Sequence, residues 1–184
     1  EVLTMTRDGI QYIHDQTIRL MNKGTPPDEL ANLVAMPAHL RDYAPYLREY
    51  YGTVKHSVRQ IYTGYLGWFD GDPVDLDPVP PLESAKRYIE LMGGRNAVLT
   101  AAEKAYADEE YQWAAELTTY LIRVDQEDAD AKQIKAAAFR HLGYAQININ
   151  WHNWYLTSAM ELEGKIEPMA SLARLAQIFS SADI

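Results

Sequence analysis

Side chains that could bind an oxyanion lie close together on one predicted helix in the first half of the sequence. Lys55, Arg59 and Tyr62 are spaced i, i+4 and i+7 and share a face, with His56 and Thr63 beside it. Such a cluster could hold a sulfate or another small oxyanion through charge-assisted hydrogen bonds. The alternative interpretation is an ordinary solvated or interdomain face.

Other residues of types that could do chemistry lack the spacing that chemistry needs. The five histidines form no His-x-His or His-x-x-x-His pair, which are the spacings that place two ligands on one metal. The absence of cysteine excludes a thiolate zinc site, a disulfide and thiol catalysis. The aspartates at 70, 72, 75 and 77 lack the spacing and the closing Glu of a calcium loop. We therefore assign no catalytic residue and no metal ligand to this sequence.

The element that positions the basic and phenolic groups is a helix followed by a stiff loop. Thr53 is a plausible N-cap. Apolar residues then recur at helical spacing at positions 54, 58, 61, 65 and 66, which predicts a core-facing side formed by these residues. Asp70, Gly71, Asp72 and Pro73 form a turn signal, and the prolines at 78, 80 and 81 require an extended backbone.

The segment before this helix reads as an arm. Residues 5–23 have a helical apolar stripe, and a short helix follows Thr25. Pro37 and Pro45 then divide the chain into short pieces with aromatic residues. We expect an extended helical arm that wraps on a neighbour and has no core of its own.

The segment after Pro81 predicts a helical bundle. Helical patterns cover residues 81–92, 96–107, 111–124, 129–142, 148–163 and 169–179, and no strand pattern is convincing. Residues 106–137 resemble one tetratricopeptide helix pair, because small residues recur where the two helices would cross. The expected fold class is all-α: a helical bundle with one tetratricopeptide-like helix pair, preceded by the arm.

Composition narrows the possible partners. The 184 residues carry a formal net charge of -9, which argues against nucleic acid binding. No window approaches the roughly 18 apolar residues of a membrane span. The chain has 13 Tyr and 4 Trp but only 3 Phe, and Tyr and Trp suit interfaces. The lack of cysteine does not fix the compartment.

One stretch resembles a known family. Residues 50–73, YYGTVKHSVRQIYTGYLGWFDGDP, and the proline-rich loop after them resemble the linear alkylsulfatases of the metallo-β-lactamase superfamily. The match falls where the zinc-hydrolase domain of that family joins its helical dimerisation domain. The resemblance covers roughly residues 7–163.

The resemblance implies a piece of a larger enzyme that hydrolyses long-chain alkyl sulfate esters, such as dodecyl sulfate, to alcohol and sulfate. Residues 1–49 would connect from a catalytic domain, residues 50–164 would form the dimerisation domain, and residues 165–184 would begin a linker to a further domain. Two zinc ions would belong to the catalytic domain, and the helical domain would form a homodimer. The junction helix would help form the substrate pocket, with Tyr62, His56 and Arg59 as its substrate-binding residues.

Two other interpretations remain open at this point. The chain could be a free-standing helical adaptor of tetratricopeptide type that binds a peptide. A self-contained enzyme is the least favoured interpretation, because no nucleophile–base arrangement is visible in the sequence.

Overall fold

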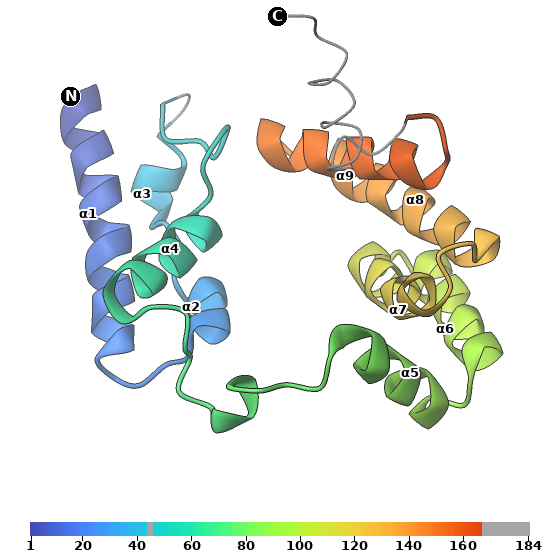
Figure 1. The fold of residues 1–184 in the computed structure, drawn as a ribbon. Coiled ribbons are helices and arrows are strands. Elements are labelled where there is room, and N and C mark those ends of the chain that lie inside the picture. Colours follow the sequence, from blue (N-terminus) through green and yellow to red (C-terminus); the bar gives the residue numbers. More distant parts are fainter. Residues whose placement is uncertain (44–45, 167–184) are drawn as a thin grey trace, which may run out of the picture. The chain divides into compact units, whose positions relative to one another are not determined.

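We describe the protein from a computed structural model, in residues 1–43 and 46–166 (Figure 1). These residues form helices joined by loops and contain no β-strand. The expected all-α class is therefore confirmed. The elements are α1 (Val2–Met21), α2 (Pro27–Leu33), α3 (Ala38–Arg41), α4 (Val54–Leu66), the 3-10 turn η1 (Pro73–Asp75), α5 (Pro81–Leu91), α6 (Arg95–Ala107), α7 (Tyr111–Val124), α8 (Ala129–Tyr144) and α9 (Ile149–Leu162). The helix predicted over residues 169–179 lies outside the described residues.

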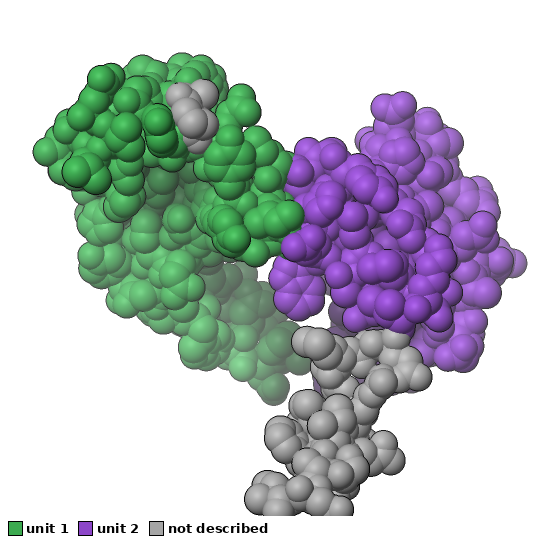
Figure 2. All heavy atoms as spheres, turned by 90° about the horizontal axis from the view of Figure 1, so that it is seen from above, with its two compact units in different colours: residues 1–79, 147–150 green, residues 80–146, 151–184 purple. Residues whose placement is uncertain are grey.

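The chain divides into two compact units (Figure 2). Unit 1 contains residues 1–79 and 147–150, and unit 2 contains the remaining residues from Pro80 onward. The predicted boundary between residues 49 and 50 concerns the domains of a longer enzyme and stays a prediction. Within this chain, α4 belongs to the same unit as α1 and α2 because it packs against both of them.

Unit 1 has a hydrophobic core to which the expected arm and α4 both contribute. The buried cluster contains Ile13 of α1, Leu30, Ala31 and Val34 in and after α2, and Val54, Val58 and Tyr62 of α4. The arm supplies two sides of this core, through α1 and α2. The third side comes from α4, which the sequence pattern had assigned to the following domain.

A buried asparagine fixes the backbone that leads into α4. The side-chain amide of Asn148 donates to the carbonyl oxygens of Glu49 and Tyr51, at 3.1 and 2.9 Å. The backbone N–H of Ile149 donates to the Tyr50 carbonyl at 2.8 Å. Buried polar groups of this kind need partners, and these bonds supply them. Residues 147–150 therefore belong to unit 1.

Unit 2 is held together by close helix packing. Two buried clusters lie between α6, α7 and α8. One consists of alanines, among them Ala114, Ala115 and Ala138, and the other combines two alanines with Val98, Leu117 and Leu121. Gly143, just past the predicted helix over residues 129–142, lies inside α8. A Cβ at this position would lie 2.9 Å from the Leu156 side chain of α9, so the glycine allows α8 and α9 to approach closely.

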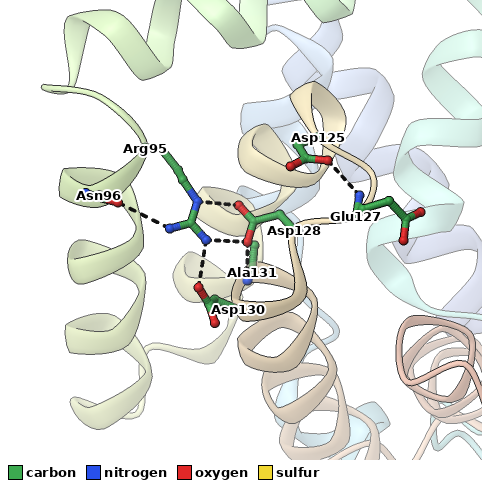
Figure 3. A network of polar contacts seen from close by, with 7 residues as sticks. All are labelled: Arg95, Asn96, Asp125, Glu127, Asp128, Asp130 and Ala131. Atoms are coloured by element: carbon green, nitrogen blue, oxygen red, sulfur yellow. Dashed lines mark hydrogen bonds and ion pairs between the residues drawn. The ribbon is translucent and has the colours of Figure 1, made fainter.

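An ion-pair network joins the first turns of α6 and α8 (Figure 3). The guanidinium of Arg95 donates to both carboxylate oxygens of Asp128, at 2.8 and 2.7 Å, and to Asp130 at 2.9 Å. Asp128 also caps α8 by accepting the Ala131 N–H at 3.1 Å. Its side chain is only 2% exposed, whereas that of Asp130 is 66% exposed. The hydrogen bonds from Arg95 lower the pKa of the Asp128 carboxyl, although burial opposes them.

We predict that Asp128→Ala destabilises the protein more than Asp130→Ala. The first change removes an N-cap, which typically costs about 0.5–2 kcal/mol, and leaves Arg95 without its buried partner. The second removes an exposed partner of the same guanidinium, and exposed pairs contribute little. Urea unfolding at neutral pH measures the loss of stability in both variants. Equal losses in the two variants would contradict the role given to Asp128.

The Arg95–Asp128 contact makes the stability of the protein depend on pH. The pKa of the Asp128 carboxyl is lower in the folded state. Its contribution to the free energy of unfolding is therefore complete above the unfolded-state pKa of about 3.9. The contribution is lost as the pH falls through the folded-state pKa. The difference in unfolding free energy between wild type and Asp128→Ala should therefore shrink in acid.

Candidate functional site

The junction helix α4 begins as the sequence predicts. The Thr53 hydroxyl accepts the backbone N–H of His56 at 3.1 Å, so the predicted N-cap is confirmed. Glu49 supplies a second acceptor, because its carboxylate oxygen lies 2.9 Å from the Val54 nitrogen. The helix ends at Gly67, which has a φ of 82°. These contacts satisfy backbone groups that a helix end leaves without intrahelical partners.

The buried side of α4 differs from the expected one in its tyrosines. Val54 and Val58 are buried as predicted, but Tyr62 continues this row and is only 6% exposed. Tyr65 and Leu66, both predicted to face the core, are 63% and 58% exposed. Tyr62 follows Val58 by one helical turn and packs in the same cluster as residues of α1 and α2. Tyr65 lies in the last turn, where its hydroxyl is 3.0 Å from Nε2 of His14 in α1.

The phenol of Tyr62 points toward the chain that leaves α4. Its hydroxyl lies 3.5 Å from the Phe69 carbonyl oxygen and 3.4 Å from that of Asp70, both of which can accept its hydrogen. The expectation that Tyr62 shares an open face with Lys55 and Arg59 is therefore wrong. In this structure, Tyr62 is a core residue with its polar end on the loop backbone.

The basic residues of α4 do lie on its exposed side. Lys55, His56 and Arg59 are exposed, and His56 and Arg59 are one helical turn apart. Arg59 Nε lies 3.7 Å from a carboxylate oxygen of Asp28 in α2. Both of these side chains are largely solvated, so the pair contributes little to stability. The structure thus brings two of the three candidate binding residues, His56 and Arg59, to one accessible surface.

The aspartates after α4 have structural uses. Asp72 Oδ1 accepts the Val74 N–H at 3.0 Å and starts η1, and Asp70 Oδ1 accepts the Asp72 N–H at the same distance. A hydrogen bond with Asp70 raises the pKa of the Asp75 carboxyl. Within residues 1–43 and 46–166, no group of three or more His, Cys, Asp or Glu side chains could hold a metal ion.

In that same part of the chain, no helix is long and apolar enough to cross a membrane.

The helices of unit 2 carry several large apolar side chains on their surface. Among the most exposed are Tyr88 and Leu91 near the end of α5 and Tyr144 at the end of α8. Trp113 of α7 and Trp154 of α9 are also exposed, the latter to 74%. Aromatic residues are enriched at protein interfaces because they bury a large area and keep a polar atom available. The sequence count of Tyr and Trp suggested an interface but did not say which of them reach the surface.

Comparison with protein families matches residues 26–165 to the alkyl sulfatase dimerisation family. The chain belongs to this family. The match covers unit 1 from Pro26 onward and the described helices of unit 2. It does not favour the alternative of a free-standing helical adaptor.

Individual relatives agree with this membership. The chain is 65% identical over 187 aligned residues to a linear primary-alkylsulfatase of Pseudomonas sp. (strain ATCC 19151), covering 100% of this chain and 35% of that protein. It is 40% identical to the alkyl/aryl-sulfatase BDS1 of Saccharomyces cerevisiae, covering 88% of this chain and 25% of that one. The chain thus spans about a third or less of the length of these relatives.

A solved structure has the same fold. The stereoselective inverting sec-alkylsulfatase Pisa1 from Pseudomonas sp. aligns with a TM-score of 0.85 and 40% sequence identity, over 92% of this chain and 27% of that one.

Proposed function

We propose that this chain provides the self-association of an enzyme that hydrolyses long-chain alkyl sulfate esters to alcohol and sulfate. The observation that carries the proposal is the 65% identity with a linear primary-alkylsulfatase along the whole chain. The family match over residues 26–165 is its second support. Dodecyl sulfate is a representative substrate, because the resemblance points to linear primary esters.

The two zinc ions implied by the resemblance would have to be held elsewhere. The described residues of this chain do not fit a metal, because they contain no suitable group of His, Asp or Glu. We therefore assign no hydrolytic step to them. Their proposed roles are to join two subunits and to present side chains to the substrate.

The proposed partner is a second copy of this chain. Aromatic and aliphatic side chains exposed on α5 to α9 supply apolar area of the kind that homodimer interfaces bury. An obligate dimer typically buries about 2,000 Å² or more. We place the interface on the helices after Pro81.

Sedimentation velocity of the 184-residue chain tests this proposal. We expect a dimer at micromolar concentration. Trp154→Glu should yield a monomer, because a carboxylate would be buried at the interface. Trp68→Glu is the matched control: Trp68 is 71% exposed, close to the 74% of Trp154, but lies in unit 1 outside α5 to α9. A wild-type monomer would contradict self-association, and a monomer with Trp68→Glu alone would move the interface to unit 1.

The proposed contacts with substrate are His56 and Arg59 on the exposed side of α4. Both can donate hydrogen bonds to a sulfate group, with added charge when the imidazole is protonated. Tyr62 enters the proposal as a positioning residue, since its buried ring anchors the helix that carries them. Lys55 lies on the same side and is a further possible donor.

Kinetics of an alkylsulfatase that contains this chain test the assignment. Arg59→Ala and His56→Ala should each lower kcat/KM roughly tenfold to a hundredfold, since a hydrogen bond to a charged group contributes about 1.5–3 kcal/mol. Gln60→Ala, also on the exposed side of α4, is the control and should retain full activity. Subunit association should not change. Full activity of both basic variants on dodecyl sulfate would leave α4 with a purely structural role.

A further inference from the structure

Unit 2 contains a groove between α7, α8 and α9 that has no role in the function proposed above. Its volume is about 620 Å³, within the range of roughly 300–1,000 Å³ that is usual for ligand pockets. Ile122 at the end of α7, Phe139 of α8 and Leu162 of α9 provide apolar lining. Arg123 and Lys135 also line it, so the groove combines an apolar surface with two cations.

Lys135 is the unusual group in this lining. Its side chain is half-buried, and Nζ lies 5.4 Å from the centre of the Phe139 ring. Burial lowers the pKa of its ammonium, and the nearby charge of Arg123 lowers it further. Within the described residues, neither Lys135 nor Arg123 forms an ion pair. Two like charges thus face the groove without a carboxylate partner, in a chain of net charge -9.

The other charged groups of the groove do not remove this excess. Lys132 lies 3.7 Å from the Glu127 carboxylate, so these two charges offset each other. Glu161 of α9 also lines the groove, where it offsets part of the positive charge. With two carboxylates against three cations, the lining still carries one net positive charge. An anion that reaches Lys135 and Arg123 would relieve their mutual repulsion, which an apolar ligand would not do.

We infer that this groove binds an aliphatic anion, a ligand with an alkyl chain and one anionic headgroup. The headgroup lies at Lys135 and Arg123, and the alkyl chain lies along Ile122, Phe139 and Leu162. Sulfur oxyanions and carboxylates share this chemistry, so the inference holds for either headgroup. The residues that line this site belong to α7, α8 and α9 and not to α4, and they perform no hydrolysis. The same helices carry the proposed dimer interface, so the test below also uses the Trp154→Glu monomer.

Calorimetric titration of the 184-residue chain with sodium decanesulfonate tests the inference. A sulfonate cannot be hydrolysed, and work below its micelle concentration avoids detergent unfolding. We expect saturable binding with one ligand per chain, and weaker binding of inorganic sulfate, which lacks the alkyl chain. Sodium decanoate is the second arm. Binding of either amphiphile in this groove supports the inference, and the stronger of the two identifies the preferred headgroup.

Two charge-neutralising variants locate the site. Lys135→Gln and Arg123→Gln should each weaken decanesulfonate binding at least tenfold. Lys104→Gln in α6, which removes an exposed lysine paired with Asp108, is the control and should bind as the wild type does. Thermal unfolding verifies that the variants are folded. Lys135→Met, which keeps the apolar stem, replaces Lys135→Gln if that variant is unstable.

Three results would overturn the inference. The first is equal binding of decanesulfonate by wild type and both variants, which means non-specific detergent adsorption. The second is inorganic sulfate binding as tightly as decanesulfonate, which would reduce the site to a simple anion site. The third is binding that appears only in the Trp154→Glu monomer, which would mean that a second copy of the chain occupies the groove.

Discussion

The row of side chains that α4 buries against α1 and α2 is the constraint on which unit 1 depends. Leu30 and Val58 are completely buried, and Ile13 and Tyr62 complete the cluster on either side of them. Burying a side chain of this size contributes about 1.5–3 kcal/mol relative to exposing it. Because one side of α4 is fixed in this way, the opposite side presents His56 and Arg59 in a defined orientation. A binding residue needs this support, since its own geometry depends on the element that carries it.

Unit 2 depends on two other features. Small side chains allow α6, α7 and α8 to pack closely, and Gly143 does the same for α8 and α9. The Arg95–Asp128 contact then fixes the start of α8 relative to α6. With backbone positions set by these contacts, large aromatic groups such as Trp113 and Trp154 are not needed in the interior. They remain available on the surface, as a self-associating domain requires.

Much of this fold could be predicted from the sequence because it rests on local signals. The bounds of α7 match the prediction, since an apolar period and an acidic turn define them. The Thr53 cap needs only a hydroxyl three residues before the backbone N–H that it accepts. The errors involve contacts between distant segments. Helical spacing is compatible with Tyr62 on either side of α4, because it lies seven residues after Lys55 and four after Val58. Packing against α1 and α2 decides that Tyr62 is covered and Tyr65 is not.

Other features had no local signal at all. Asn148 bonds to residues almost a hundred positions earlier, and Arg95 to a carboxylate 33 positions later. Neither residue type predicts such a partner. The groove at Lys135 was also missed, because its lining comes from three helices and its lysine resembles any other in the sequence. The family resemblance supplied the functional expectation, and residue chemistry alone would not have supplied it.

Hydrogen exchange at the amides of α4 is the most direct test of the central claim that this helix is part of the core of unit 1. The account predicts that the amide protons of Val58 and Tyr62 exchange as slowly as those of the buried turns of α1, because only unfolding of the unit exposes them. Exchange of these protons at the rate of an isolated, fraying helix would contradict it. In that case, α4 would not be held by the row that ends at Tyr62, and the exposed basic side would have no fixed orientation.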